Sequence, residues 1–396
     1  MWLTNRFGRV IFISDLKRAE RLLAKGTMQK ASSAMAKQRQ AEMMSTTMNT
    51  AESSGKTVFY QTVRRSADGY GMSRDLVKNE LFKQGVFLSE NMIGQKVGLL
   101  YNYPYGITQM RNDVRLIYTM FESDQIPEDW ADYLNEADEV LVPSKWCKDV
   151  FKKRGVEATV VPLGYNAEVF SYIERPVPFK NEEPFVFIHY NSFNVRKGFI
   201  EVFNAFTEEF LPEENVKLIL KTTAEKPPIP VIPSQYPNVE VLKGSVSEEE
   251  LLSILGKANC MVYPSRGEGF GITPLEAMAT GLPAIVPNAH GISEYFDPEY
   301  MLEVKIEEEI PALYNKFKGE DVGKMVVCDV DDLRKQMRYA FSHQQEMHNM
   351  GKKASEYVKQ YSYRETATKL KGIIEHWQNK HVPRRADAEY LDVMEV

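Results

Sequence analysis

Cysteine is scarce in this sequence, and long apolar runs are absent. The 396 residues include three cysteines, Cys147, Cys260 and Cys328, which lie far apart and form no Cys-x-x-Cys pair. This spacing argues against a disulfide framework and a structural zinc site, and it fits a reducing compartment. No stretch approaches the ~18 consecutive apolar residues of a membrane span. The first residues, MWLTNRFGRVIFIS, also lack the pattern of a secretory signal. We therefore expect a cytoplasmic protein without a transmembrane segment.

The net charge of −6 is unevenly distributed along the chain. Residues 1–120 hold 18 Lys/Arg and 9 Asp/Glu, a balance of +9, so the rest of the chain carries −15. A basic first third could steer an anionic partner such as nucleic acid or a membrane surface. An unevenly charged, solvated surface explains the same numbers, so charge alone leaves both interpretations open.

Composition separates the first 56 residues from the rest. Residues 26–56 are rich in Met, Ser, Ala, Thr and Gln and contain no aromatic or β-branched aliphatic residue. Such a segment buries little apolar surface, so we expect a mobile linker or a loosely held helix. Before it, RVIFI is typical of a short strand and SDLKRAERLLAKG of a capped helix. Residues 1–56 are thus predicted to form a basic appendage with a mobile linker.

From residue 57 onward, short apolar strands alternate with helical patterns. The predicted strands are TVFYQTV, VFLS, KVGLLYN, VRLIYTMF and EVLVPS, and after the proline-rich SYIERPVPFKNEEP they are PFVFIHYNS, VKLILKT, VEVLKG, CMVYPS and PAIVP. This alternation predicts an α/β fold with two Rossmann-like domains facing each other across a cleft, with the small N-terminal appendage in front. In such sheets, ligands bind beyond the carboxyl ends of the strands.

One glycine-rich loop carries two carboxylates where a phosphate site would carry none. In SRGEGFGITPLEAMATGLPAIVP, residues 265–287, Glu268 and Glu276 stand eight positions apart. Taken alone, Thr273, Pro274 and Glu276 have the spacing of a helix capping box, and Glu268 could be a surface residue. Cations follow the strand FVFIHY in NSFNVRKGF, where a basic helix start on the surface is the alternative to a phosphate site.

The combined motifs resemble glycosyltransferase family 4. Glu-x7-Glu within EGFGITPLE is followed by GLPAIVP and HGISE, and DGYG, EVLVPSKWCKDVFKKRGV, VVPLGYN, SFNVRKG and LKGSVSEEEL lie in the expected order. The resemblance spans roughly residues 57–380 and excludes residues 1–56. It implies a retaining enzyme of GT-B architecture. The expected domains are an acceptor-side domain (57–170), a nucleotide-sugar-binding domain (171–362), and a C-terminal helix returning to the first domain, with a tail (363–396).

The resemblance also implies roles for individual residues. Glu268 would face the transferred sugar and stabilise charge at its anomeric carbon, while Arg196 and Lys197 would neutralise the diphosphate as its charge grows in the transition state. Many relatives have an arginine where this chain has Ser192, so we expect Arg196 to take over part of that charge. Glu276 would accept the ribose hydroxyls. The expected donor-binding residues are Gly69, Tyr70, Gly71, Ser192, Gly244, Ser245, Val246, Gly269, Phe270, Gly271, Ile272 and Glu276.

None of the six histidines lies in the first domain, where many relatives place one near the sugar. A retaining mechanism in which the leaving phosphate accepts the acceptor's proton needs no such base. We interpret His290 as a hydrogen-bonding loop residue. DVDD at 329–332 contains the Asp-x-Asp with which another class of transferases holds manganese, but its position favours a helix cap. We expect no metal and no cofactor, because the nucleotide-sugar, UDP by family habit, is a substrate.

The acceptor is less well defined. Arg64 and Arg65 next to the GYG loop, together with Arg74, are candidate acceptor-binding residues. We expect the acceptor to be an anionic polymer, and the most specific hypothesis is a hydroxymethylated pyrimidine in DNA, as in the DNA glycosyltransferases of tailed phages. Such an enzyme would act in the host cytoplasm, on a base flipped out of the duplex. The alternatives are a transferase of surface polysaccharide or glycolipid synthesis, and a non-catalytic nucleic-acid-binding protein with a degenerate GT-B fold. The basic residues that favour a polyanion are Arg6, Arg9, Lys17, Arg18, Arg21, Lys25, Lys30, Lys37 and Arg39.

Overall fold

The computed structural model of the protein describes most of the chain as two compact units. The described residues are 2–5, 10–12, 28–30, 57–61, 69–89, 95–176, 183–224, 235–312, 314, 317 and 319–383. The units are Met1–Thr57 and Val58–Val396. In the first, β1 (Trp2–Asn5) pairs antiparallel with both β2 (Val10–Phe12) and β3 (Met28–Lys30). β2 lies within the predicted strand RVIFI, whereas the helix predicted after it lies outside the described residues.

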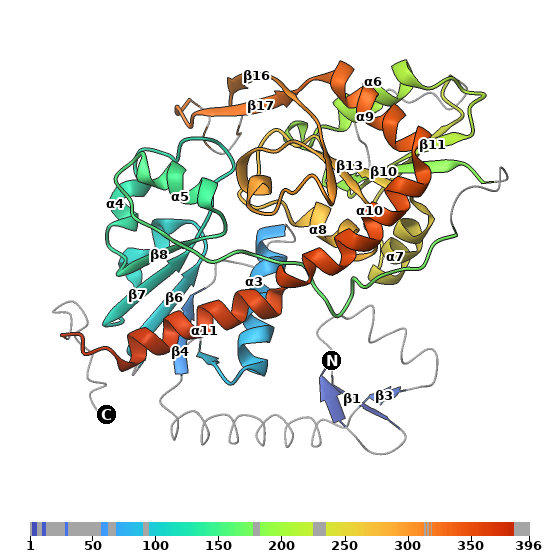
Figure 1. Ribbon diagram of the computed structural model, residues 1–396. Coiled ribbons are helices and arrows are strands. Elements are labelled where there is room, and N and C mark those ends of the chain that lie inside the picture. The colour runs from blue at the N-terminus through green and yellow to red at the C-terminus, as the bar shows by residue number, and fades with distance from the viewer. Residues whose placement is uncertain are drawn as a thin grey trace. The chain divides into compact units, whose positions relative to one another are not determined.

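The second unit contains two six-stranded sheets (Figure 1). The first has the order β5-β4-β6-β7-β8-β9, and its strands from β4 to β9 pair in parallel. β6 and β7 are buried along their whole length, which explains why their sequences are continuous apolar runs rather than alternating ones. Its strands are β4 (Thr57–Gln61), β5 (Phe87–Ser89), β6 (Val97–Tyr101), β7 (Val114–Tyr118), β8 (Glu139–Val142) and β9 (Thr159–Val160).

The second sheet is parallel throughout and has the order β12-β11-β10-β13-β14-β15. Its strands are β10 (Phe185–Asn191), β11 (Val216–Thr222), β12 (Val239–Leu242), β13 (Cys260–Val262), β14 (Ala284–Val286) and β15 (Met301–Glu303). The chain runs outward from β10 to β12 and then returns to place β13 on the other side of β10. The strand order therefore reverses between β10 and β13, and ligands of such sheets bind outside the carboxyl ends of the strands at that point.

Helices connect the strands at the predicted places. α7 begins with a capping box between Ser247 and Glu250, and the Asp329 side chain caps α9, so the cap predicted for DVDD is confirmed. No described helix is long and apolar enough to cross a membrane. The helices are α3 (Gly69–Lys83), α4 (Trp130–Leu134), α5 (Lys145–Lys152), α6 (Phe199–Glu209), α7 (Glu248–Lys257), α8 (Ile272–Ala279), α9 (Val330–Ser342), α10 (Gln344–Tyr357) and α11 (Tyr363–Asn379), and the 3-10 turns are η1 (Pro104–Gln109), η2 (Val195–Lys197), η3 (His290–Glu294) and η5 (Val358–Gln360).

The second unit has a first half built around the sheet β4–β9 and a second half built around the sheet β10–β15. Helix α11 follows the second sheet in sequence but packs on the first half. Figure 1 shows it running alongside α3, and Lys371 Nζ donates to Gln84 O at 3.0 Å. Near its end, Trp377 Nε1 donates to Glu139 Oε2 at 2.6 Å, which fixes the helix to the start of β8. The described part of the segment 363–396 therefore contacts both α3 and β8.

An antiparallel hairpin interrupts the parallel pattern and was not predicted. β16 (Ile306–Pro311) pairs with β17 (Lys324–Cys328). Phe317, from the connection between these strands, is buried in the core of the first half, against Phe121 and Trp130. At the base of the connection, Lys324 N donates to Asp124 Oδ1 at 2.6 Å. The hairpin therefore connects the two sheets of the unit without extending either of them.

Candidate active site

A buried cluster of charged side chains lies at the carboxyl ends of β10 and β13. The loop after β10 forms η2 and supplies Arg196 and Lys197, and the loop after β13 supplies Glu268. Lys197 and Glu268 are 71 residues apart in the sequence, but they are in direct contact because β10 and β13 are neighbours in the sheet. The structure therefore brings together the three residues predicted to be catalytic, Glu268, Arg196 and Lys197.

The Glu268 carboxylate is held from several sides. Its Oε1 accepts hydrogen bonds from Lys197 Nζ at 2.6 Å, Ser265 Oγ at 2.6 Å and Tyr263 OH at 2.8 Å. Its Oε2 lies 3.1 Å from Arg196 Nη1. Glu268 is 6% exposed and Lys197 9%. A carboxylate this deeply buried is stable as an ion only with such partners, and Oε2 retains capacity to accept a further hydrogen bond.

Glu122, which the sequence reasoning did not select, completes the cluster. Arg196 Nη2 lies 3.6 Å from Glu122 Oε1, and Arg196 Nη1 also donates to Gly267 O. Glu122 follows β7 in the first half, so Arg196 contacts carboxylates from both halves. The signal for it in the sequence was a carboxylate directly after the predicted strand VRLIYTMF, at the edge where a ligand would bind. The four charged groups Glu122, Glu268, Arg196 and Lys197 balance to zero net charge.

The cluster shifts the pKa values of its members in opposite directions. Burial alone would raise the pKa of Glu268, but the charges of Arg196 and Lys197 hold it well below its usual range. Burial, together with the charge of Arg196, lowers the pKa of Lys197. Burial also opposes the charge of Arg196, but Glu268 and Glu122 raise its pKa above the usual value. Glu268 and Arg196 are thus strongly held in their charged forms, whereas Lys197 gives up its proton more readily.

Glu276 has a different environment, and the capping-box alternative for it is wrong. α8 begins at Ile272 with Gly271 as its N-cap, so Thr273 lies inside the helix, where its Oγ1 accepts from Asn191 Nδ2 at 3.2 Å. Glu276 is partly exposed, and its Oε2 accepts from Tyr190 OH at 3.2 Å. Burial raises its pKa to about 8, although the hydrogen bond from Tyr190 opposes the shift. Its carboxylate is therefore not used by a helix cap and is easily protonated.

The predicted donor-binding residues Gly244, Ser245 and Val246 follow β12, and a buried lysine supports their loop. Gly244 has a φ of 80°, and its carbonyl accepts a hydrogen bond from Lys221 Nζ at 2.5 Å. Lys221 is 4% exposed, so it is a structural support that the sequence reasoning missed. Ser245 and Val246 are exposed beyond this anchor. Ser192 is also exposed, and its N–H and its Oγ donate to Oδ1 of the neighbouring Asn191, outside the Glu268 cluster.

The loop from Gly269 to Ile272 lies against both halves of the unit. Gly269 O accepts from Ser144 Oγ at 2.9 Å, and a Cβ at Gly269 would meet the Met120 side chain at 2.9 Å. Phe270 is buried and packs edge-on against Tyr295. Gly271 has a φ of 85°, a left-handed conformation that favours glycine. No side chain caps the start of α8, which leaves its first N–H groups available to a ligand.

The predicted residues of the first half have a mixed outcome. Gly69, Tyr70 and Gly71 form the first turn of α3, so the loop predicted over GYG is wrong: the helix begins three residues before the expected start at Met72. Arg74, expected at the acceptor, is 5% exposed, and its guanidinium donates to Asp75 Oδ1 at 3.0 Å. The other two candidate acceptor-binding residues, Arg64 and Arg65, lie outside the described residues.

His290 differs from its expected role as a hydrogen-bonding loop residue. It is 5% exposed, has a φ of 52°, and its Nδ1 has no hydrogen-bond partner among the described residues. Its backbone carbonyl, rather than its ring, accepts a hydrogen bond, from Ser293 Oγ at 2.6 Å. Among the described residues, no group of three or more His, Cys, Asp or Glu side chains could hold a metal ion.

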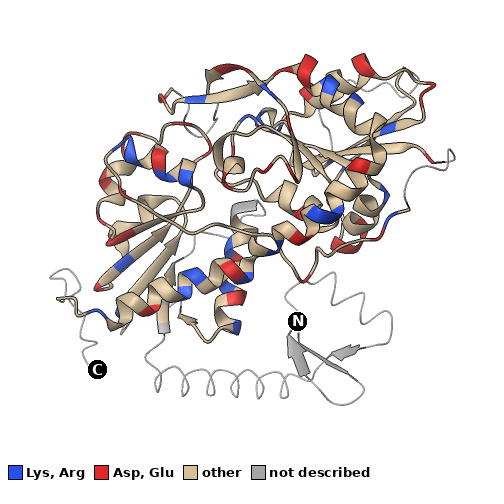
Figure 2. Ribbon diagram, viewed as in Figure 1, with Lys and Arg blue, Asp and Glu red and all other residues tan. Residues whose placement is uncertain are grey.

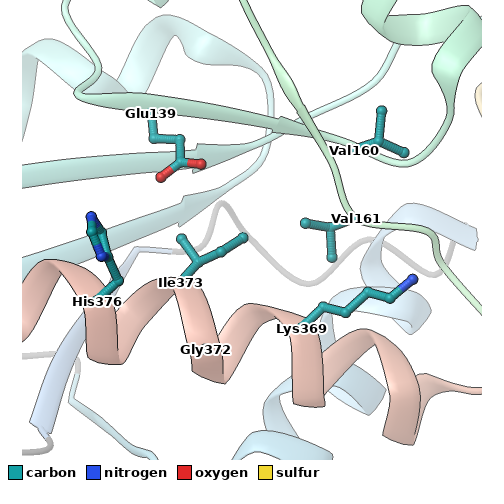
Figure 3. Close-up of a pocket in the computed structure, with 7 residues that line it drawn as sticks. All are labelled: Glu139, Val160, Val161, Lys369, Gly372, Ile373 and His376. Atoms are coloured by element: carbon teal, nitrogen blue, oxygen red, sulfur yellow. The ribbon is translucent and has the colours of Figure 1, made fainter.

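A separate cavity lies between α11 and the edge of the first sheet (Figure 3). It has a volume of about 410 Å³ and is lined by Val160, Val161, Gly372 and Ile373 together with Glu139, Lys369 and His376. Glu139 is already bonded to Thr159 Oγ1 and Trp377 Nε1. Because no convergent set of charged groups faces this cavity, the candidate active site is the Glu268 cluster.

Comparison with known proteins agrees with this assignment. The family model described as Glycosyl transferases group 1 matches residues 172–306. The protein named "Putative glycosyltransferase ORF313" of Acidianus filamentous virus 1 (isolate United States/Yellowstone) is 25% identical over 266 residues, which cover 63% of this chain and 76% of that protein. O-antigen chain mannosyltransferase RfbU of Salmonella typhimurium is 36% identical over 85 residues, covering 19% of this chain and 24% of RfbU.

The fold is shared with solved structures. Anabaena Alr3699/HepE, solved in complex with UDP-glucose, aligns with a TM-score of 0.59 at 11% identity, over 81% of this chain and 99% of that one. The GT-B fold predicted from the motifs is confirmed by this match and by the two Rossmann-like halves. The group 1 domain and the related transferases identify a transferase enzyme.

Proposed function

We propose that the chain is a retaining glycosyltransferase of the family 4 type that moves a sugar from a nucleotide-sugar to an acceptor hydroxyl. The observation that carries this proposal is the convergence of Arg196 and Lys197 on Glu268 at the carboxyl ends of two neighbouring strands. All three residues lie within the stretch 172–306 that matches the glycosyltransferase domain. The proposed reaction requires no metal and no cofactor.

The cations and the start of α8 would bind the donor diphosphate. Negative charge grows on the leaving diphosphate as the bond to the sugar breaks, so fixed cations lower the barrier. The uncapped N–H groups of α8 add a second set of donors, since a helix N-terminus attracts anions. Glu276 would accept the ribose hydroxyls, and the exposed Val246 would contact the base. UDP is the simplest nucleotide for this site, and the Anabaena structure with UDP-glucose supports that choice by analogy of fold.

Glu268 would stabilise the sugar in the transition state. Its Oε1 is fixed by three donors, so Oε2 is the oxygen that would accept a sugar hydroxyl or face positive charge at the anomeric carbon. The acceptor oxygen forms a bond to that carbon on the face from which the diphosphate leaves. The bond from the carbon to the phosphate oxygen breaks, and the acceptor's proton passes to that oxygen. This sequence balances without a protein base.

Two acceptor classes follow from different parts of the chain. Residues 1–57 hold 10 Lys/Arg and 4 Asp/Glu, a balance of +6, which favours an anionic polymer and, most sharply, a hydroxymethylated pyrimidine in DNA. A different observation favours a sugar hydroxyl of a polysaccharide or glycolipid: β16 presents the exposed run Glu307, Glu308 and Glu309, and Figure 2 shows acidic residues along it. Carboxylates repel phosphates but accept hydrogen bonds from sugars.

The test is release of nucleoside diphosphate from UDP-, GDP- and ADP-sugars. Each donor is incubated with hydroxymethylcytosine duplex DNA, unmodified duplex, an oligosaccharide, or no acceptor. We expect turnover in the native chain and a loss of at least about a hundredfold in Glu268→Ala and Lys197→Ala, the size typical of a lost transition-state contact. Glu214→Gln is the matched control, because Glu214 pairs with Arg338 in an ion pair away from the site.

The outcomes separate the alternatives. Turnover with modified duplex alone would identify a DNA-modifying transferase, and turnover with the oligosaccharide alone would identify a saccharide transferase. DNA binding without turnover of any donor would contradict the proposal and leave a non-catalytic nucleic-acid-binding protein. Equal loss of turnover in Glu214→Gln would assign the effect to stability rather than to the site.

A further inference from the structure

A second cavity lies beside the Glu268 cluster and has no assigned role. Its volume is about 310 Å³, and both halves of the second unit contribute to it. The loop after β7 supplies Asp124, the first turn of α5 supplies Trp146, η3 supplies His290, and the hairpin supplies Glu309 and Lys324. This volume is at the low end of the ~300–1,000 Å³ typical of ligand pockets, so it suits a single small ring.

The wall of this cavity is continuous with the backbone that holds Glu268. Gly291 follows His290, and its N–H donates to Glu268 O at 2.8 Å. A Cβ at Gly291 would lie 2.2 Å from Gly269 O, so the two loops are in direct backbone contact. On the other side, Ser144, two residues before Trp146, donates to the same Gly269 O at 2.9 Å. A group bound in the cavity is therefore held by the loops that position the Glu268 carboxylate.

His290 carries two local costs that a ligand would explain. Its φ of 52° is a conformation that side chains other than glycine rarely adopt. Its ring is 5% exposed and lines the cavity, yet Nδ1 has no hydrogen-bond partner among the described residues. Burial lowers the pKa of His290 to about 4, so the ring is neutral at pH 7 and can both donate and accept. A glycine would avoid both costs, so the ring serves a purpose that the fold alone does not require.

The other lining groups suit a neutral ring bearing hydroxyls. Trp146 is partly exposed, and its ring meets that of His290 edge-on at 5.2 Å, which offers a flat apolar face for the C–H groups of a sugar. Asp124 and Glu309 supply two carboxylates against one Lys324, whose Nζ lies 3.2 Å from Glu309 Oε2. Asp124 Oδ2 is also paired with Lys153 Nζ at 3.4 Å, so the wall has no excess of positive charge to attract a phosphate or a polyanion, while carboxylates accept strongly from hydroxyl donors.

We propose that the cavity between Trp146, His290, Asp124 and the β16–β17 hairpin is an acceptor subsite that binds one pyranose ring of a neutral saccharide. The inference rests on the proposed transferase function and names its acceptor class. The subsite adds no chemical step: it places a sugar hydroxyl beside the loop that carries Glu268. The hairpin, which lies between β15 and α9 in the sequence, supplies the outer wall of the subsite through Glu309 and Lys324.

The test measures binding separately from turnover. Saturation-transfer NMR is recorded on the full chain with methyl α-D-mannopyranoside, methyl α-D-glucopyranoside and methyl β-D-galactopyranoside, and with 5-hydroxymethyl-2′-deoxycytidine as the competing class. Trp146→Ala removes the flat face, and we expect at least about tenfold weaker glycoside binding. His290→Gly removes the ring and relieves the backbone, so it should fold well yet bind the glycoside more weakly. Trp377→Ala is the matched control, a partly buried tryptophan on α11 outside the cavity, and should bind normally.

Each result decides the inference. Glycoside binding that weakens in Trp146→Ala and His290→Gly but not in Trp377→Ala supports the subsite. Binding unchanged in both cavity variants, no saturation transfer to any glycoside, or displacement of the glycoside by the hydroxymethyl nucleoside overturns it. Titration with UDP, GDP and ADP reports independently on the donor site. Nucleotide binding without glycoside binding therefore refutes the subsite alone, whereas glycoside binding without any nucleotide binding would refute the proposed donor site.

Discussion

The Glu268 cluster shows how neighbouring side chains keep a buried carboxylate ionised. Two cations and two hydroxyl groups surround it, and Glu122 balances the second cation. Removing two charges from water costs several kcal/mol per ion, and only such dense pairing offsets it. In the proposed donor complex, Arg196 would exchange the partly exposed Glu122 for a phosphate without moving Glu268.

The stability of Glu268→Gln tests this balance. Because the folded-state pKa of Glu268 lies below its usual value, its stabilising effect is fully present above the unfolded-state pKa of about 4.3 and is lost as the pH falls below it. We expect Glu268→Gln to destabilise the protein by about 3 kcal/mol at pH 7, and by less near pH 4. Urea unfolding at both pH values measures this. The surface pair variant Glu214→Gln should cost less than about 1 kcal/mol, and an equal cost for the two variants would contradict the argument.

Glu276 predicts the pH dependence of nucleotide binding. Burial raises its pKa to about 8, so near pH 7 the carboxyl group is largely protonated in the free protein. Ribose hydroxyls donate to the ionised form, so binding below pH 8 must release a proton. We expect the Kd for UDP to fall up to about tenfold per pH unit as the pH rises toward 8, and to level off above it. Titration calorimetry between pH 6 and 9 measures this. In Glu276→Gln the dependence should flatten, and an unchanged slope in that variant would assign the proton to another group.

At the scale of the elements, the strands were predictable and the contacts between loops were not. Continuous apolar runs such as VGLLY and FVFIHY are buried on both faces, so local sequence sufficed to predict β6 and β10. The hairpin was missed because IEEEIP, which forms β16, is almost entirely exposed and has no apolar alternation. Glu122 was missed because its contact with Arg196 joins two separate sheets. The spacing within EGFGITPLE singled out Glu268, yet only the structure shows that Gly271, and not Thr273, occupies the N-cap position of α8.

The crossing of α11 over the first half gives a prediction about one glycine. Gly164 lies against the start of this helix, where Tyr165 bridges to Ser362, and a Cβ there would sit 2.3 Å from a Ser362 backbone carbon. Backbone cannot move aside as a flexible side chain can, so we expect Gly164→Ala to destabilise the protein by roughly 1–3 kcal/mol. Urea unfolding measures the change in midpoint.

Gly372, within α11, is the matched control for Gly164. A Cβ there would meet nothing within 4 Å, and alanine is the better helix former, so Gly372→Ala should be neutral or stabilising by up to about 1 kcal/mol. Equal effects of the two substitutions would mean that the crossing of α11 over the loop at Gly164 is not tightly packed in solution.

At the scale of the whole molecule, charge separates the two units. Residues 1–57 carry +6, and residues 58–396 hold 39 Lys/Arg and 51 Asp/Glu, a balance of −12. The proposed donor site lies in the acidic unit, where cations are concentrated locally at Arg196 and Lys197. A long-range attraction for a polyanion can therefore arise from the first unit alone, whatever hydroxyl finally accepts the sugar.

This separation predicts how the full chain binds DNA. We expect weak binding to duplex DNA that falls steeply with salt, because each neutralised phosphate contributes about 0.9 to the slope of log K against log salt. Replacing Lys17, Arg18, Arg21 and Lys25 with Gln should reduce that slope by up to about 3.6 and leave UDP binding unchanged. Fluorescence polarisation with a labelled duplex over a series of salt concentrations measures this, and Lys305, Lys335, Lys352 and Lys353 replaced with Gln provide a control of equal charge change in the second unit. If the control weakened DNA binding as much as the first set, the polyanion would contact both units alike, and the basic first unit would not be the source of the attraction for DNA.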